Sequence, residues 1–444
     1  MGRRRRELSF EVTLQTLPCP VRARQSQLAT KTARPKSDLG PALTSSPGAL
    51  VSLPHMAGLI IQPRARLFHG HDWVYSTEVL KTFGDPQDGG IVSLKDGRDR
   101  MLGTAIYNSR SQIIARRFSR QRQDLDLDFF KRRISIARQF RNRHGLPEQL
   151  GRLIWSESDG LPGVVVDRYG DDLVLQTLTL AMDQRKALLV EALVDAFQPR
   201  CIIERNDAPI RKAEGMELVT GVLYGPEPGP GSITTDGLTF GVDLLQGQKT
   251  GFYLDQLSNY RAVAAHAAGK RVLDCFTNQG AFALSCAKAG ASEVTAIDIS
   301  GPAIEQVRLN AKANGLSVNA IEGNVFDFLK EKEDAQATYD LIVLDPPSFT
   351  KSKGRVHDAL RGYKEIHLRA LKLLNPDGLL ATFCCSHHMS QELFQGVIND
   401  AAVDAKKTLR HLQNFTQGLD HPVISTIPES SYLKGALYEL VPGR

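Results

Sequence analysis

Two neighbouring cysteines follow a short apolar run in the last quarter of the chain. Leu379–Phe383 has the composition of a buried strand, and Cys384, Cys385 and Ser386 come directly after it. Because alternate residues of a strand face opposite ways, only one of the two thiols can enter a pocket. A thiolate that adds to C6 of a pyrimidine makes C5 nucleophilic, which is one reaction that such a residue serves. Two small buried cysteines without a catalytic role are the alternative.

A carboxylate in a rigid turn is the second group that could do chemistry. Asp345-Pro-Pro-Ser-Phe349 follows the apolar run Leu341–Leu344. Two prolines fix an extended turn that cannot continue as a helix. The turn would hold the Asp345 carboxylate and an aromatic ring beside a ligand. Turns of this type are typical of S-adenosylmethionine enzymes that act on planar bases.

Arg271–Ser300 predicts the scaffold that positions these groups. Val272–Cys275 has the pattern of a buried strand, a polar turn ends at Gly280, and a helix leads to a second strand, Val294–Ile297, followed by Asp298. This order is that of a nucleotide-binding βαβ unit. The helix N-terminus offers N–H groups to a ligand, and Asp298 can accept from both hydroxyls of a ribose.

The composition of the turn favours S-adenosylmethionine over a dinucleotide. The fingerprint G-x-G-x-x-G brings the backbone close to a pyrophosphate, but here Asn278 occupies one glycine position and only Gly280 remains. A cofactor without phosphate tolerates that loss. On this unit alone, NAD and an α/β repeat that binds no cofactor remain alternatives.

Residues 232–444 alternate between short apolar strands and helices, which predicts an α/β fold with a mostly parallel, doubly wound sheet. After Asp298 the predicted strands are Asn319–Glu322, Leu341–Leu344, Leu379–Phe383, His411–Phe415 and Leu433–Leu440. The predicted helices are Pro302–Asn314, Val325–Glu331, Tyr363–Leu374 and Gln391–Ala405. Ligands of such sheets lie at the carboxyl ends of the strands, where the groups described above fall.

Three segments precede this domain. We expect residues 1–55 to be a disordered basic extension, because they carry Pro, Ser, Thr and Arg without periodicity and hold the whole formal net charge of +6. A transit peptide and a translation start upstream of the native one are both open for this extension. Residues 56–120 predict a small β domain and residues 121–231 a central α+β domain, which ends at the Pro/Gly-rich run Gly225–Gly231.

Basic and aromatic residues indicate an RNA partner. Arg64–Trp73 holds two arginines, two histidines and two aromatic residues, which can contact phosphates and stack on bases. Arg110–Arg143 holds eleven Lys/Arg against three Asp. The alternative is that Phe68 and Trp73 are core residues and the charges are solvated. No apolar run is long enough to span a membrane, and the six scattered cysteines favour a reducing cytoplasm without a metal site or a disulfide framework.

From Met56 to Arg444 the chain resembles the PUA-domain class I 23S rRNA (cytosine-C5) methyltransferases, the large-subunit methyltransferase I family. The resemblance rests on the Arg64–Trp73 stretch and on several motifs: WSESDGLPGVVVDRYG (Trp155–Gly170), RKAEGMEL (Arg211–Leu218), GQKTGFYLDQ (Gly247–Gln256), LDPPSFTKSK (Leu344–Lys353), RGYKEIH (Arg361–His367), CCSHH (Cys384–His388) and DHPV (Asp420–Val423). It implies an N-terminal PUA domain, a central α+β domain and a class I methyltransferase domain.

The resemblance also assigns residues. It implies catalysis by Cys385 and Asp345, and we expect a positive environment to lower the pKa of Cys385. It implies S-adenosylmethionine contacts from Gln256, Asp274, Phe276, Thr277, Asn278, Gly280, Asp298, Ile299, Asn324, Val325 and Asp345. From the basic and aromatic segments we expect RNA contacts from Arg64, Arg66, His69, Trp73, Arg116 and Arg117.

The chain departs from the family at two positions and differs from the two-cysteine rRNA cytosine methyltransferases at a third. Cys384 replaces the usual serine, and Asn324 replaces an aspartate that accepts from the adenine amine, a bond that an asparagine carbonyl can also accept. Ser348 stands where two-cysteine rRNA cytosine methyltransferases carry a second cysteine, so the base that assists release of the thiolate is left open.

The resulting hypothesis is an S-adenosylmethionine-dependent enzyme that forms 5-methylcytosine in large-subunit rRNA in the cytoplasm. A base nitrogen methyltransferase and a non-catalytic RNA-binding factor of ribosome assembly are the alternatives. The sequence predicts no membrane partner and leaves a homodimer open.

Overall fold

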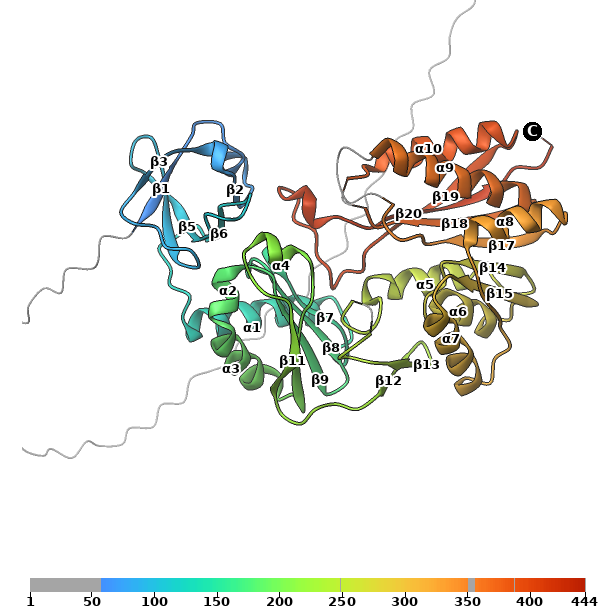
Figure 1. The fold of residues 1–444 in the computed structure, drawn as a ribbon, viewed down its shortest axis with the longest axis horizontal. Coiled ribbons are helices and arrows are strands. Elements are labelled where there is room, and N and C mark those ends of the chain that lie inside the picture. The colour runs from blue at the N-terminus through green and yellow to red at the C-terminus, as the bar shows by residue number, and fades with distance from the viewer. Residues whose placement is uncertain (1–56, 248, 350–355, 387, 444) are drawn as a thin grey trace, which may run out of the picture. The chain divides into compact units, whose positions relative to one another are not determined.

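The computed structural model describes residues 57–247, 249–349, 356–386 and 388–443 (Figure 1). The expected extension at residues 1–55 lies outside them. Among the described helices, none combines the length and the apolar character needed to cross a membrane.

The first sheet has six strands in the order β2-β6-β5-β4-β1-β3. Its strands are β1 (Gly58–Ile61), β2 (Trp73–Val74), β3 (Val79–Phe83), β4 (Ile91–Asp96), β5 (Met101–Tyr107) and β6 (Ala115–Ser119). Apolar side chains such as Leu59, Val92 and Ala105 form its core. The sequence predicts strands at Leu59–Ile61, Ile91–Leu94, Leu102–Ile106 and Ile113–Phe118, which correspond to β1, β4, β5 and β6. It does not predict β2 and β3, because β2 has two residues and β3 is largely exposed.

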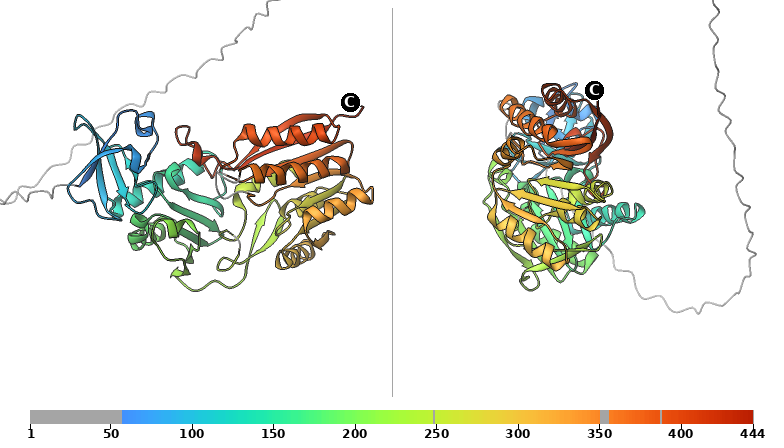
Figure 2. Two further views of the ribbon diagram at one scale, coloured as in Figure 1. Left: turned by 45° about the horizontal axis from the view of Figure 1, so that its top comes forward. Right: turned by 90° about the vertical axis from the view of Figure 1, so that its right-hand side faces the viewer.

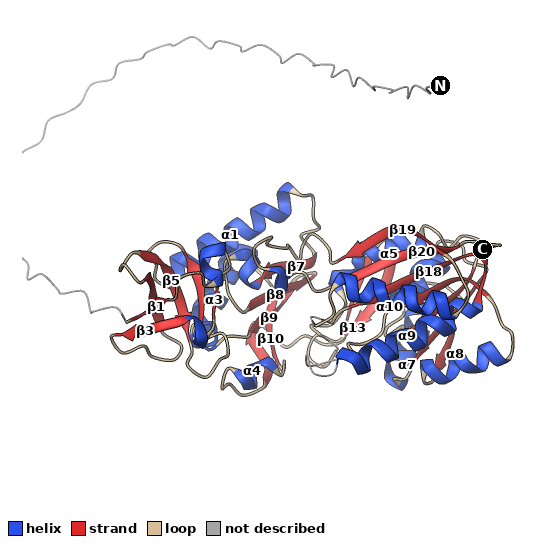
Figure 3. Ribbon diagram, turned by 90° about the horizontal axis from the view of Figure 1, so that it is seen from above, coloured by secondary structure: helices blue, strands red, loops and turns tan. Residues whose placement is uncertain are grey.

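The second sheet has the order β11-β10-β9-β8-β7. Its strands are β7 (Leu150–Trp155), β8 (Val164–Tyr169), β9 (Asp172–Thr177), β10 (Cys201–Asn206) and β11 (Val219–Tyr224), and its helices are α1 (Leu127–Arg143), α2 (Leu180–Gln184), α3 (Lys186–Phe197) and α4 (Ile210–Ala213). Helix α1 begins where the Asp126 carboxylate accepts from Phe129 N (2.7 Å). Helices α1 and α3 pack together (Figure 3).

The basic segment Arg110–Arg143 is less available to a polyanion than its composition indicates. Six of its basic residues form ion pairs: Arg116 with Glu157, Arg117 with Asp72, Lys131 with Asp195, Arg132 with Asp128, Arg138 with Glu148 and Arg141 with Asp159. All but one of these acids lie outside the segment in sequence, so a count of charges along the chain overlooks them.

The third part carries a hairpin, β12 (Gly231–Thr235) and β13 (Leu238–Val242), and a seven-stranded sheet in the order β16-β15-β14-β17-β18-β20-β19. Its strands are β14 (Arg271–Cys275), β15 (Glu293–Asp298), β16 (Asn319–Glu322), β17 (Tyr339–Leu344), β18 (Leu374–Cys384), β19 (Leu409–Thr416) and β20 (Lys434–Leu440). The first five strands in this order are parallel, and β20 runs antiparallel to both of its neighbours. The predicted doubly wound sheet is therefore confirmed.

Helices cover both faces of this sheet (Figure 2). Apolar residues of α5 (Leu257–Ala264), α6 (Ala281–Lys288) and α7 (Gly301–Ala313) belong to one core. Those of α8 (Val325–Asp334), α9 (Val356–Leu373) and α10 (Gln391–Asp404) belong to the other. Successive residues of β17 alternate between the two cores, as the pleat of a strand requires. Burial on both faces explains why these strands are continuous apolar runs.

Two predicted boundaries were wrong. The helix predicted over Tyr363–Leu374 begins at Val356, and the strand predicted over Leu379–Phe383 begins at Leu374. The sequence Asn375-Pro-Asp-Gly378 is typical of a turn, yet the strand continues through an irregular register there. Gly290 follows the end of α6 with φ 90°, the left-handed conformation that commonly terminates a helix.

The connection between β19 and β20, residues 417–433, contacts both N-terminal sheets. Glu429 lies 2.9 Å from Nε2 of His71, and the Thr426 hydroxyl donates to Gly70 O (2.9 Å). Asp420 accepts from Arg152 N (2.9 Å) at the start of β7. One connection of the third part is thus bound to the first and the second.

Candidate active site

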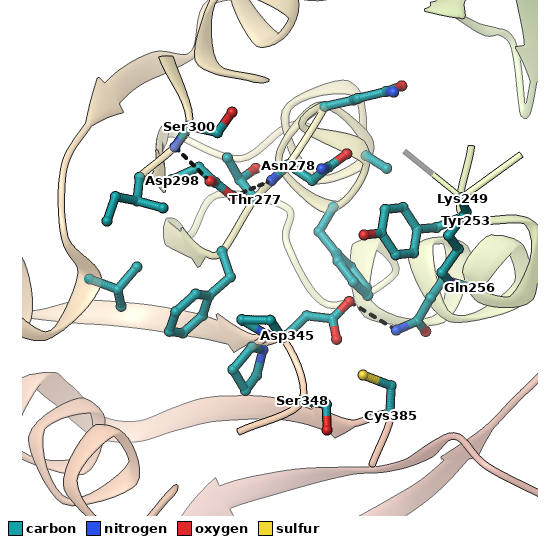
Figure 4. A pocket seen from close by; sticks show the side chains of 18 of the residues that line it. Lys249, Tyr253, Gln256, Thr277, Asn278, Asp298, Ser300, Asp345, Ser348 and Cys385 are labelled. Atoms are coloured by element: carbon teal, nitrogen blue, oxygen red, sulfur yellow. Dashed lines mark hydrogen bonds between the residues drawn. The ribbon is translucent and has the colours of Figure 1, made fainter. Parts of the chain in front are cut away.

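A pocket of about 600 Å³ lies at the carboxyl ends of the parallel strands (Figure 4). Its walls come from the turns that follow β14, β15, β16, β17 and β18, and from residues 249–260. Parallel strands place their following turns along one edge of the sheet, so residues far apart in sequence meet there. All predicted cofactor and catalytic residues line this pocket except Asp274 and Gly280.

The turn after β14 has an unusual backbone. Phe276, Asn278 and Gly280 have φ values of 62°, 49° and 82°, all in the left-handed region. A Cβ on Gly280 would lie 2.6 Å from Leu284 Cδ1 and 3.1 Å from Val307 Cγ1 of α7, so glycine suits the close packing here as well as the angle. Left-handed non-glycine residues cost free energy and cluster at ligand sites.

Asp274 lies behind the pocket wall and fastens this turn. Its Oδ2 accepts from the Thr277 hydroxyl (2.5 Å) and from Ala283 N (3.0 Å). Burial raises its pKa to about 7. Asp274 and Gly280 do not line the pocket but support the residues that do, and the prediction that they contact the cofactor stays a prediction.

Asp298 joins the turns after β14 and β15. Its Oδ2 accepts from Asn278 N (2.9 Å) and its Oδ1 from Ser300 N (3.0 Å), so both oxygens are held at the pocket wall (Figure 4). Ile299 beside it is 70% exposed and presents an apolar side chain to the pocket. Asn324 caps α8 by accepting from Phe326 N (2.8 Å), and Val325 is buried next to it.

These groups fit a cofactor that has an adenosine and an amino-acid end. Oδ1 of Asn278 and Oε1 of Gln279 are buried and accept no hydrogen bond from the described residues. Buried acceptors normally accept a hydrogen bond, and the ammonium group of a bound cofactor would donate the missing ones. The Asp298 carboxylate can accept from ribose hydroxyls, and Ile299 with Phe326 offers apolar surface for a purine.

Asp345 faces the pocket from the turn after β17. Nε2 of Gln256 donates to its Oδ2 (3.0 Å). Burial raises the pKa of Asp345 to about 7, although Lys249 opposes this effect. The carboxyl group is therefore half protonated near neutral pH and can donate or accept a proton.

Cys385 and Cys384 have different surroundings. Cys384 is buried in the core that contains α8, α9 and α10, whereas Cys385 lines the pocket and contacts the opposite core. Burial and Asp345 raise the pKa of Cys385 to about 11, and Lys249 opposes them. The expectation that protein groups lower the pKa of Cys385 was thus wrong, because burial outweighs the effect of the Lys249 ammonium.

Comparison with known proteins agrees with this geometry. Residues 221–417 match the S-adenosylmethionine-dependent methyltransferase family, and residues 62–120 match the PUA-like domain family. The ribosomal RNA large subunit methyltransferase I of Erwinia tasmaniensis is 41% identical over 376 residues, which are 83% of this chain and 95% of that protein. The protein of the same name from Shewanella denitrificans is 42% identical over 375 residues, or 82% of this chain and 94% of the relative.

The chain belongs to the ribosomal RNA large subunit methyltransferase I family. Its cofactor is S-adenosylmethionine, as expected from the turn after β14. The fold is shared with a Streptococcus mutans protein described as a SAM-dependent methyltransferase (TM-score 0.74, 24% identity, 86% of this chain and 99% of that one). It is also shared with a methyltransferase structure that contains SAH (TM-score 0.75, 23% identity, the same coverage).

Sequence reasoning about this family missed the contribution of residues 249–255. Lys249 forms an ion pair with Asp255 (2.9 Å), and its ammonium lies 4.0 Å from the centre of the Tyr253 ring. Both Lys249 and Asp255 line the pocket. The motif Gly247–Gln256 contains both residues, but the sequence analysis predicted a pocket role only for Gln256.

The residues predicted to bind RNA divide into two groups. Arg64 and His69 are exposed, and Arg66 is partly exposed beside Tyr75 and Glu78. Trp73 Nε1 donates to Glu157 Oε1 (2.7 Å), and Arg116 pairs with the same carboxylate. Arg117 is 8% exposed and pairs with Asp72 (2.7 Å). The second group, Trp73, Arg116 and Arg117, therefore holds the first sheet in place through internal contacts.

Proposed function

We propose that this methyltransferase forms 5-methylcytosine in large-subunit rRNA and that Cys385 is the nucleophile. The observation that carries the proposal is that Cys385 and Asp345 line the same pocket at the ends of adjacent parallel strands (Figure 4). Cys384, by contrast, is buried in the core on the opposite face of the sheet. The names of the curated relatives support rRNA of the large subunit as the substrate.

The residues support a covalent mechanism. The Cys385 thiolate adds to C6 of the cytosine, while the protonated Asp345 donates to N3, so that C5 becomes nucleophilic. When bound, S-adenosylmethionine supplies the electrophilic methyl group. Loss of the proton from C5 and release of the Cys385 thiolate then restore the aromatic ring.

The other pocket residues position the reactants. Gln256 holds the Asp345 carboxyl through its amide, and Asp298 with Asn278 would hold the ribose and the amino-acid end of the cofactor. Lys249 is the cation of the pocket wall that favours the thiolate. Exposed Arg64 and His69 of the first sheet would contact RNA phosphates outside the pocket.

Trapping with 5-fluorocytosine tests this proposal. Fluorine at C5 cannot leave as a proton, so an enzyme that attacks C6 stays bound to the methylated RNA. We expect an adduct between transcribed large-subunit rRNA that contains 5-fluorocytosine and the wild-type enzyme, with the RNA attached to the peptide that contains Cys385. Turnover of the natural RNA without any adduct would favour methylation of a base nitrogen instead.

A further inference from the structure

A second pocket of about 590 Å³ lies beside the cofactor pocket, and the proposed chemistry does not use it. Lys249, Phe252 and Asp255 line both pockets, so they form a shared wall. The opposite wall comes from the second sheet and the β19–β20 connection: Arg152, Trp155, Gln176, Arg205, His421 and Tyr432. Its volume is within the range of about 300–1,000 Å³ that small-molecule sites occupy.

Aromatic rings dominate one side of this second pocket. The Trp155 ring centre lies 5.8 Å from that of His421 and 5.6 Å from that of Tyr432. The Arg152 guanidinium lies 4.7 Å from the centre of the Trp155 ring. Indole rings and guanidinium planes are the surfaces on which proteins stack unpaired bases.

Hydrogen bonds hold this surface rigid. Arg152 donates to both oxygens of Asp167 (2.7 and 2.8 Å), and Asp167 also accepts from the Thr250 hydroxyl (2.6 Å). The Tyr432 hydroxyl donates to Asp255 in the shared wall (2.7 Å). A planar ligand that stacks here would not have to order these side chains, which lowers the entropic cost of binding.

The charges of the second pocket favour a base over a bare phosphate. Three cations line it, Arg152, Arg205 and Lys249, and two carboxylates, Asp207 and Asp255, oppose them. Arg205 also donates to the carbonyl oxygens of Leu244 (3.1 Å) and Gly247 (2.7 Å). Because most donors are engaged by protein groups, recognition by stacking fits better than a phosphate clamp.

We propose that the second pocket binds the base of a nucleotide adjacent to the target cytosine. The base stacks on the Trp155 and Arg152 surface, and the phosphate that links the two nucleotides lies at the shared wall near Lys249. This inference rests on the proposed function, since it takes RNA as the substrate and places the target base in the first pocket. The two pockets would then hold two consecutive bases of an unpaired RNA strand, one on each side of the shared wall.

Tryptophan fluorescence tests the proposal directly, because the chain has two tryptophans, Trp73 and Trp155. In the Trp73→Phe protein, Trp155 is the single reporter, and we expect hexacytidylate and hexaadenylate to quench its emission in a saturable manner. The Trp155→Phe protein, which reports from Trp73, should show a smaller change. Unchanged Trp155 emission at RNA concentrations that saturate binding would overturn the proposal.

An affinity measurement provides the second readout. Trp155→Ala should weaken oligonucleotide binding by about 5- to 150-fold, the effect of losing one stacked base. The control is Tyr224→Ala, which removes an aromatic side chain that is 42% exposed on β11 and should leave affinity unchanged. Equal affinity of the Trp155→Ala and wild-type proteins would contradict the proposal. The emission experiment does not depend on correct folding of the Trp155→Ala protein.

Adduct formation separates this inference from the proposed function. After trapping has located the target cytosine, 5-fluorocytosine RNAs with an abasic residue on either side of it are compared. A lower adduct yield with one abasic neighbour supports the second pocket. Equal yields would reject the second pocket and leave the cytosine chemistry intact. Quenching of Trp155 without any adduct would reject the chemistry and leave the second pocket standing.

Discussion

Cys384 and Cys385 are consecutive residues that belong to opposite faces of the seven-stranded sheet. The Cys384 side chain is fully buried beside Tyr363 of α9, and Cys385 lines the cofactor pocket. The pleat of β18 separates them, since alternate residues of a strand point to opposite sides. Their chemical roles should differ as much as their surroundings.

Substitution of the two cysteines should therefore give contrasting results. We expect Cys385→Ala to abolish methylation of large-subunit rRNA while RNA and cofactor affinities stay within about twofold, because only the proposed nucleophile is lost. Cys384→Ser should retain activity, with stability lowered by about 1–3 kcal/mol through burial of a hydroxyl. Methyl transfer from radiolabelled S-adenosylmethionine measures both. An active Cys385→Ala enzyme would contradict the nucleophile assignment.

The dependence of kcat/KM on pH should reflect the ionisation of both Asp345 and Cys385. Below about pH 7 Asp345 is protonated, so kcat/KM should rise tenfold per pH unit with the thiolate fraction of Cys385. Above about pH 7 the loss of the Asp345 proton cancels that gain, and the profile should be flat toward pH 11. Asp345→Asn should lower the rate about 10²–10⁴-fold and remove the bend near pH 7. A bend that persists in this variant would assign it to another group.

Lys249 should control the reactivity of Cys385. In a Cys384→Ser background, Lys249→Met should slow alkylation of Cys385 by iodoacetamide at pH 8, because loss of the ammonium raises the pKa of the thiol further. A tenfold slower reaction corresponds to about one pKa unit. Lys249→Arg keeps the charge and serves as the matched control. Identical alkylation rates in all three proteins would show that Lys249 does not act on the thiol.

Asp298 should contribute to cofactor affinity. Asp298→Ala removes the acceptor for ribose and leaves Asn278 N and Ser300 N without their partner, so S-adenosylmethionine should bind about 1–3 kcal/mol more weakly. Isothermal titration calorimetry measures the difference. Glu305→Ala on the exposed face of α7 is the control. Unchanged affinity of the Asp298→Ala protein would refute the ribose role.

Asp274 should make stability depend on pH. Its pKa is about 7 in the folded protein against 3.8 for the unperturbed group, so the folded state binds more protons between these values. The contribution of Asp274 to stability should therefore be largest below about pH 4 and decrease toward pH 7, by up to about 1.4 kcal/mol per pH unit. Asp274→Asn should reduce this slope in thermal unfolding at pH 5 to 8, whereas the exposed Asp334→Asn should not. Equal slopes in all proteins would contradict the raised pKa.

Local patterns were sufficient to predict the parallel sheet and most of the pocket. Each strand of the sheet is a short apolar run, and the residue that follows the run lies at the carboxyl edge by geometry alone. This is why Asp298, Asp345 and Cys385 could be placed together before any coordinates were known. The same reasoning placed Asp274 and Gly280 at the pocket, but they lie behind its wall. Position near the end of a strand does not tell whether a residue faces the pocket or supports its wall.

Long-range partners could not be predicted from the sequence. Arg116 and Arg117 belong to a basic segment, yet Glu157 and Asp72 neutralise them from distant positions. Lys249 sits in a turn without periodicity, and only the folded chain shows that it borders two pockets. Pairing of charges depends on tertiary packing, which neither composition nor spacing encodes.

The connection between β19 and β20 limits how this enzyme can be recombined with its relatives. Glu429 and Thr426 contact the first sheet, Asp420 contacts the second, and the same connection leads into Lys434, the partner of Cys384 in the β18–β20 ladder. A chimera that exchanges only residues 57–120 would present a foreign surface to a connection whose Glu429 and Thr426 contact the original one. Residues 417–433 should be grafted together with the first sheet, as one structural unit that is split in the sequence.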